Sequence, residues 1–264
     1  VFLDGPGKAA PGETDVFAGI DTSLPGLAAL AGLPAGALAA ELSAADAAVA
    51  RAVDEFDLRD PSKVVPHLAV ALTQIRAARA AAAKIDAPAS AKAEAEFLLA
   101  IKEADAALAL QRASGTVVDA LADQEVVAPG ESFGTTVRVF LAQPAMVKIT
   151  GVSLRTPEGW TSAPSQPAQP DPSNFMARFF RENADRTDAF ALTVPAGAPP
   201  TQPYWLTTPR NGAPMFTWPA DAPKGLPFAP PLVSAEVQAE IGGVTVTLTQ
   251  PVQYRLVDQV RGEL

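Results

Sequence analysis

One stretch of this chain spells a motif of hydrolytic enzymes. Residues 130–134 read Gly-Glu-Ser-Phe-Gly, the G-x-S-x-G pattern that surrounds the nucleophilic serine of many hydrolases. The motif requires a strand before it, a helix after it and a histidine later in the chain. Here Pro129-Gly130 predicts a turn before it, a strand follows, and the only histidine, His67, lies upstream. We therefore interpret residues 130–134 as a turn.

The remaining polar residues do not form a recognisable catalytic or metal-binding pattern. His67 has too few possible partners for a histidine zinc site or a Ser-His mechanism, so we expect it to be a packed or surface residue. The chain has no H-E-x-x-H motif, P-loop or dinucleotide-binding fingerprint. Its 29 acidic residues could still include a glycosidase-type pair, although most fall on helix faces predicted to be solvated. The sequence thus indicates no catalytic residue, no metal ligand and no cofactor in this chain.

The aromatic residues Trp160, Tyr204 and Trp205 are the candidate ligand-binding residues. Together with Trp218 they fall at predicted strand ends or in Pro-rich loops. Exposed rings there could stack on sugar rings. The alternative is that they hold the long loops against the sheet, because large aromatic side chains bury much area. If they bind a glycan, Trp205→Ala should weaken binding without unfolding the chain.

The elements that carry these residues change in kind near Gly115. Residues 1–19, rich in Gly and Pro, predict a linker or the end of a preceding domain. Residues 20–115 are Ala-rich with helical period, and residues 116–264 alternate with period two. We expect an α+β chain: an antiparallel three-helix segment followed by an immunoglobulin-like antiparallel β-sandwich.

Three amphipathic helices are expected in the first half. Asp60-Pro61 predicts the start of the second, and Pro88 follows its end. Their predicted buried faces are Leu38, Leu42, Ala45, Val49, Val53 and Phe56 in the first helix; Val64, Leu68, Ala71, Ile75, Ala78 and Ala82 in the second; and Phe97, Ile101, Ala104 and Leu108 in the third.

In the second half, the clearest prediction is a hairpin. Two alternating apolar runs flank Gly242-Gly243, and a Gly-Gly pair suits a two-residue turn in which both positions have positive φ. Residues 132–141 alternate in the same way, with Val137 and Val139 on one face. The Pro-rich stretches 161–173 and 207–231 are predicted to be surface loops.

The overall composition narrows the choice of partners. A net charge of −9 and a pI near 4.7 argue against nucleic acid and anionic membranes, which both favour basic surfaces. The uncharged apolar stretch over residues 24–40 is interrupted by Pro and Gly, so we expect no membrane insertion. Without cysteine the chain can form neither disulfides nor thiolate metal sites. It begins at Val1 with neither Met nor a basic signal region, and we expect it to be a piece of a longer protein.

Several short sequence segments, taken in their order along the chain, resemble those of a known protein family. They are residues 19–23 (GIDTS), 127–131 (VAPGE), 157–160 (PEGW), 201–206 (TQPYWL) and 254–263 (YRLVDQVRGE). This order resembles the non-catalytic C-terminal region of large bacterial proteins of the PIG-L (LmbE-like) N-deacetylase family. The part from residue 129 to residue 160 also resembles the immunoglobulin-like domains that accompany bacterial glycoside-active enzymes. The likeness covers most of the chain from Gly19 on.

In that family a zinc-dependent N-terminal domain deacetylates N-acetylated amino sugars, using a His-Pro-Asp-Asp motif and a further histidine. Pro66-His67-Leu68 is not that motif, because no Asp follows. No catalytic or zinc-binding residue carries over. The resemblance implies an accessory region that supports a catalytic domain upstream of Val1 or presents its substrate, and that domain would hold the zinc.

The resemblance further implies an exported protein, periplasmic or extracellular, and a family pattern that continues beyond Leu264. The alternative from another class is a stand-alone carbohydrate-binding or protein-interaction module. A hydrolase with an unrecognised carboxylate pair is a third possibility.

Overall fold

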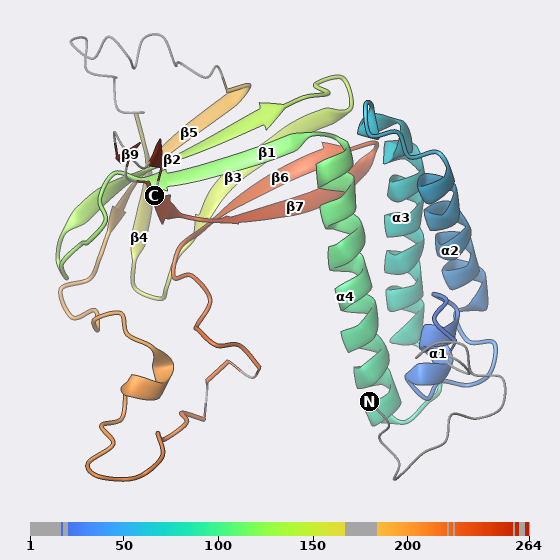
Figure 1. Cartoon of the computed structure of the whole chain (residues 1–264), viewed down its shortest axis with the longest axis horizontal. Helices are drawn as coiled ribbons and strands as arrows, with labels where there is room; N and C mark the ends of the chain where they lie inside the picture. Colours follow the sequence, from blue (N-terminus) through green and yellow to red (C-terminus); the bar gives the residue numbers. More distant parts are fainter. Residues whose placement is uncertain are drawn as a thin grey trace. The chain divides into compact units, whose positions relative to one another are not determined.

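The structure is a computed structural model that describes residue 17 and residues 21–166, 184–220, 222–223, 225–255, 257–258 and 262–263. The linker expected over residues 1–19 lies outside these residues, apart from Phe17. The chain forms two compact units. One comprises residues 1–114 with 241–244, and the other comprises residues 115–240 with 245–264. The expected mixed α+β content is confirmed, with all α-helices before Gly115 and all strands after it (Figure 1).

In the described part of the first unit there are four α-helices and one 3-10 helix. They are α1 (Gly26–Leu30), α2 (Ala39–Asp54), η1 (Pro61–Val64), α3 (Val65–Ala82) and α4 (Ala89–Ala113). Pro61 opens η1, as the Asp60-Pro61 pair predicts, but Asp60 does not cap the backbone. Its Oδ1 instead accepts a hydrogen bond of 2.5 Å from the Ser62 hydroxyl.

The helical core is built largely from alanine. α3 packs against both α2 and α4 and lies between them (Figure 1). The core at the end nearest α1 consists of Ala28, Ala31, Leu33, Leu38, Leu42, Ala78, Ala82, Ala91, Ala95 and Leu99. Since alanine is small, the helix axes can approach closely, although each contact buries little apolar area.

The predicted buried face of α4 is wrong. Phe97 is 60% exposed, and Ile101 and Leu108 are also exposed, whereas Ala95, Leu99 and other residues of the opposite face are buried. On that opposite face α4 carries a second apolar stripe, Ala91, Ala95, Leu99 and Leu110, and this stripe is the one that the bundle buries. Periodicity alone cannot choose between two apolar stripes on one helix.

Salt bridges flank the interface between α3 and α4. Arg76 Nε lies 2.8 Å from Glu103 Oε1, and Arg79 Nη1 lies 2.7 Å from Glu103 Oε2. Arg79 also pairs with Glu96. Burial raises the pKa of the Glu103 carboxyl, but the hydrogen bonds and positive charges of the two arginines outweigh this effect and hold the pKa below its usual value.

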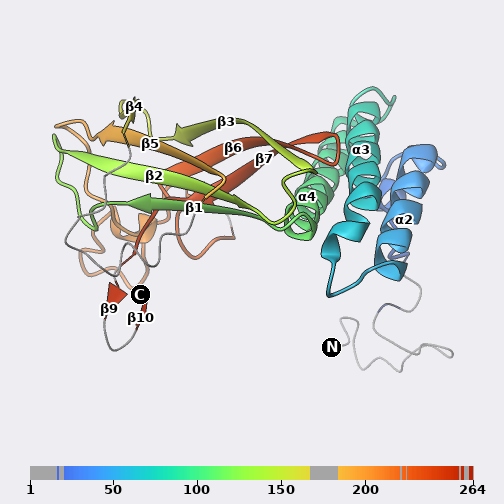
Figure 2. The ribbon, with the colours of Figure 1, turned by 90° about the horizontal axis from the view of Figure 1, so that it is seen from above.

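The second unit contains two larger sheets. The five-stranded sheet has the order β4-β5-β2-β1-β8, and β5, β2 and β1 lie side by side in Figure 2. Its strands are β1 (Thr116–Ala122), β2 (Ser132–Leu141), β4 (Thr161–Ser165), β5 (Arg186–Thr193) and β8 (Gln253–Tyr254). The three-stranded sheet β3-β6-β7 consists of β3 (Val147–Arg155), β6 (Ser234–Ile241) and β7 (Val244–Pro251). β9 (Val257–Asp258) and β10 (Gly262–Glu263) pair separately.

Alternation along the strands places the core as the sequence predicts. In β2, Val137 and Val139 are fully buried while Thr136 and Arg138 are half-exposed. β6 and β7 are neighbours joined by Gly242 and Gly243, which have φ values of 57° and 83°. Both positive φ values agree with the predicted Gly-Gly turn.

The predicted loop over residues 161–173 is wrong at its beginning. Residues 161–165 form β4, which pairs antiparallel with β5 and lies at the edge of its sheet. Pro164 is tolerated there because one side of an edge strand needs no hydrogen-bond donor. Residues 167–173 lie outside the described part of the chain. Between β5 and β6, the long connection contains η2 (Tyr204–Leu206).

Candidate binding groove

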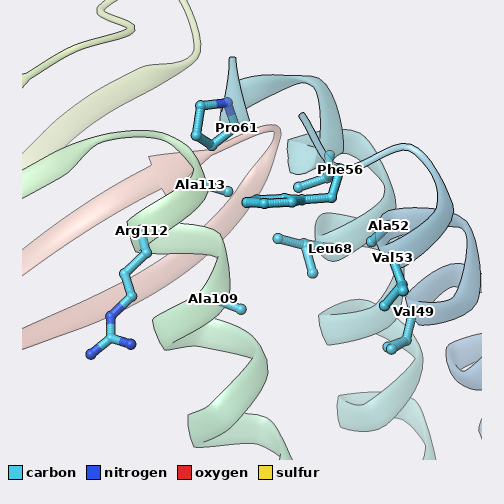
Figure 3. Close-up of a pocket in the computed structure, with 10 residues that line it drawn as sticks. Val49, Ala52, Val53, Phe56, Pro61, Leu68, Ala109, Arg112 and Ala113 are labelled. Carbon is cyan, nitrogen blue, oxygen red and sulfur yellow. The ribbon is translucent and has the colours of Figure 1, made fainter. Parts of the chain in front are cut away.

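An open apolar groove lies in the helical unit, at the end of the bundle away from α1. It has a volume of about 560 Å³. Figure 3 shows Phe56 and Leu68 between the α4 wall, with Ala109 and Ala113, and the α2 wall. Its complete lining is Val49, Ala52, Val53, Phe56, Pro61, Val64, Leu68, Ala109, Arg112 and Ala113.

The groove exists because the apolar stripe of α2 extends beyond the part that the bundle covers. Leu42 and Ala45 are fully buried, as expected from the period of the helix. Val53 and Phe56, which were expected on the same buried face, are 70% and 55% exposed. The prediction is wrong at this end because no described element of the unit lies over these side chains.

The apolar side chains of the groove are also larger than those of the covered core. Val49, Val53, Phe56 and Leu68 line the open end, whereas alanine dominates the opposite end. The sequence contains one part of this signal, since Phe56, the largest residue of the predicted face, comes last. Periodicity alone could not reveal it, because periodicity assigns a face of the helix but not the length over which that face is covered.

Among the described residues that line the groove, Arg112 alone is ionisable. Its side chain starts on α4 beside Ala113, and its guanidinium extends away from Phe56 and Leu68 (Figure 3). Among the described residues, no carboxylate forms an ion pair with it. The groove thus combines an apolar floor with one positive charge at the α4 rim, which suits binding rather than acid–base chemistry.

Two ion pairs are formed by residues next to those of the lining. His67 Nε2 lies 2.9 Å from Glu55 Oε2, which gives His67 a surface partner. Lys63 Nζ lies 2.7 Å from Asp57 Oδ2. The hydrogen bond from Lys63 holds the pKa of Asp57 below its usual value. Both pairs are formed within the helical unit.

The structure brings two of the three predicted aromatic ligand-binding residues together. The rings of Tyr204 and Trp205 meet edge to face with centroids 4.9 Å apart. Tyr204 also contacts Trp218, and Trp205 contacts Phe228 with centroids 5.4 Å apart. These four rings, here called the loop cluster, all belong to the connection between β5 and β6.

Trp160 lies in a different aromatic contact. It ends a turn over residues 157–160, and its amide donates a 3.2 Å hydrogen bond to the Pro157 carbonyl. Its ring meets Phe133 of β2 edge to face, with centroids 6.4 Å apart. Trp160 is half-buried there, so its ring can help to hold the turn against the sheet.

The G-x-S-x-G stretch forms a turn followed by a strand. Gly130 has a φ of 91°, and its amide donates to the Val194 carbonyl at 3.0 Å. Ser132 begins β2, and its hydroxyl lies 2.7 Å from that of Thr193. The serine is therefore engaged by the neighbouring strand.

A metal-binding group and a membrane-spanning helix are both absent from the described residues. No group of three or more His, Cys, Asp or Glu residues there is placed to hold a metal ion. Nor does any helix in this part of the chain have the length and apolar character needed to cross a membrane.

Comparison with known proteins does not assign the chain to a family. No family model matches it, and no curated protein matches it significantly. The structure is thus that of a mixed α+β protein with an open apolar groove in its helical unit.

Proposed function

We propose that this chain is a non-catalytic accessory region of a PIG-L-like protein. It supports a zinc-dependent N-acetyl-sugar deacetylase domain in the same polypeptide, or presents that domain's substrate. The resemblance of the ordered strings from Gly19 onward supplies the family. The open groove is the observation that carries the binding role, because contiguous exposed apolar side chains mark surfaces that bind partners.

The elements within each of the two units support this assignment in part. We take the two sheets of the second unit to be the halves of an immunoglobulin-like sandwich, supported by the alternating burial of β2, β6 and β7. We likewise take α2, α3 and α4 to be the three-helix segment, with α1 as an addition. The zinc would belong to the upstream catalytic domain, and the protein would be exported.

The first test is to read the coding sequence that precedes Val1 in the parent gene. We expect a domain with a His-Pro-Asp-Asp motif. A start codon or an export signal alone would contradict the proposal. The second test is association in solution: this chain and the separately produced upstream domain should bind each other in titration calorimetry. Failure to bind, with both partners folded, would also count against it.

The loop cluster favours a second candidate function, a stand-alone carbohydrate-binding module. Phe228 is 63% exposed beside the half-buried Trp205, so part of the cluster faces solvent. Soluble glycans should then change the tryptophan fluorescence of the isolated chain, and Trp205→Ala should abolish the change. Unchanged fluorescence over a wide range of glycans would reject this candidate.

A third candidate, a hydrolase with a carboxylate pair, is tested by activity. Chromogenic glycosides and N-acetyl sugars should not be turned over by the isolated chain under the accessory proposal. Turnover that survives repurification would overturn it.

A further inference from the structure

The chain itself shows what can fill the space between α2 and α4. At one end of the bundle, α1 lies beside these two helices (Figure 1). A small space there is lined by Leu27 and Ala28 of α1, by Leu38 and Leu42, and by Ala95, Leu98 and Leu99 of α4. The apolar side of a short helix thus closes this end of the bundle.

The groove is the corresponding space at the other end. Its walls are again α2 and α4, and its floor is formed by Val64 and Leu68. No described element of the helical unit takes the place there that α1 takes at the first end. A helix in the groove would extend the same packing over the rest of α3, as in a four-helix arrangement.

The two walls have the features that a bound helix requires. Val49 and Val53, spaced i and i+4, lie on one face of α2, and Phe56 follows just beyond the end of this helix at Asp54, so that all three line the α2 side of the groove. On the α4 side, Ala109 and Ala113 are small and allow a helix axis to come close. Grooves of this type bind amphipathic helices through apolar residues at i, i+3, i+4 and i+7.

Arg112 indicates the charge of the bound helix. A helix lying in a groove buries its apolar face and keeps its polar flanks at the rims. The guanidinium of Arg112 extends at the α4 rim, outside the apolar floor, and has no carboxylate partner among the described residues (Figure 3). An Asp or Glu on the flank of the bound helix could form a bidentate pair with it.

We infer that the groove binds a short amphipathic helix that carries a carboxylate on the flank facing Arg112. The inference rests on the proposed function, in which this helix belongs to the upstream catalytic domain.

The test uses the whole 264-residue chain and two synthetic helical peptides of about 15 residues. One peptide has leucines at i, i+3 and i+7 and a glutamate on each flank, and the other has lysine in place of each glutamate. Binding is followed by the fluorescence anisotropy of a label on the peptide. The wild-type chain should bind the glutamate peptide more tightly than the lysine peptide.

Three variants locate the binding. Val53→Asp places a charge in the groove and should weaken binding of the glutamate peptide about tenfold or more. Val70→Asp is the matched control, because Val70 is an exposed valine of α3 outside the lining, and it should leave binding unchanged. Arg112→Glu should reverse the preference, so that the lysine peptide binds more tightly. Circular dichroism confirms that each variant is folded.

Several results would overturn the inference. They are the absence of saturable binding of either peptide, equal effects of Val53→Asp and Val70→Asp, and an unchanged charge preference in Arg112→Glu. Sedimentation showing that two copies of the chain associate through the groove would also overturn it. So would binding of dodecanoate in the groove without binding of either peptide.

Failure of the inference can be separated from failure of the proposed function. If the upstream domain binds the chain and Val53→Asp leaves that binding intact, the accessory function stands and the groove inference fails. If the glutamate peptide binds but the upstream domain does not, the groove inference stands and the accessory function fails.

Discussion

The hydroxyl of Tyr204 donates a 2.8 Å hydrogen bond to the backbone carbonyl of Leu226, which lies 22 residues further along the chain. The Tyr204 side chain is also among the few buried ones of the long connection between β5 and β6. One ring therefore joins two distant parts of this connection, by packing against Trp205 and Trp218 and through this hydrogen bond. These contacts favour a structural role for Tyr204.

Removal of this hydroxyl should destabilise the connection. We expect Tyr204→Phe to lower the free energy of unfolding by about 1 kcal/mol, because the Leu226 carbonyl loses its partner. Chemical denaturation followed by tryptophan fluorescence measures the change. Tyr254→Phe is the control, since Tyr254, the only other tyrosine, is 39% exposed and should have little effect. Equal effects of both substitutions would contradict the role of the Tyr204 hydrogen bond.

The corrected packing of α4 can be tested with two substitutions on opposite faces. Leu99→Ala should lower the free energy of unfolding by about 2–5 kcal/mol, because Leu99 is almost fully buried in the helical core. Phe97→Ala removes a larger side chain but should cost much less, because that side chain is mostly exposed. Thermal unfolding followed by circular dichroism compares the two. A larger loss for Phe97→Ala would support the face expected from periodicity instead.

Glu103 should make the stability of the helical unit depend on pH. Its pKa is lowered in the folded state, so its contribution is fully present above the unfolded pKa of about 4.3 and is lost as the pH falls through the lower folded value. Glu103→Gln should cost about 1–2 kcal/mol at neutral pH, because its bonds to Arg76 and Arg79 lose their charge.

The difference in stability between wild type and Glu103→Gln should therefore shrink below about pH 4. Urea denaturation at a series of pH values measures it. Glu94→Gln on the same helix is the control, because Glu94 is exposed and forms no ion pair among the described residues. A difference that stays constant down to pH 2 would exclude this linkage.

Position 115 requires a glycine for two reasons, the positive φ of its backbone and the closeness of the Ala142 side chain. Its φ is 64°, and a Cβ atom there would lie 2.5 Å from the Cβ of Ala142. Gly115→Ala should lower the free energy of unfolding by about 2 kcal/mol, with the positive φ contributing about 1 kcal/mol of it. Gly212→Ala isolates the conformational cost, because Gly212 has a φ of 86° with open space around it. Thermal melts that give equal losses for both variants would rule out the steric contribution.

Periodicity in the sequence was sufficient for the elements whose environment is set locally. The inward residues of β2 follow from alternation, and the turn at Gly242-Gly243 follows from the ability of glycine to adopt positive φ. Pro61 likewise marks where a helical segment begins, because proline lacks the amide that an inner helical position must donate. Pro88, which was predicted to follow the end of the second helix, immediately precedes α4, whereas α3 already ends at Ala82.

The contact partners of the three predicted aromatic residues could not be predicted from the local sequence. Their positions in the connections were readable from the sequence, but Tyr204 is paired with Leu226 and Trp160 with Phe133 only in the folded chain. Whether any of them binds a glycan stays a prediction. The contact partners could not be deduced, because they are separated by many residues of irregular chain.

The sequence by itself determined that α2 and α4 each have an apolar stripe; only the tertiary structure decided which parts of those stripes are covered. On α4 the bundle buries the stripe that contains Ala95 and Leu99 and leaves the stripe that contains Phe97 exposed. On α2 the stripe is covered at Leu42, near α1, and left open at Val53 and Phe56. Burial depends on which other elements pack against a residue, and helical periodicity does not show which elements do so.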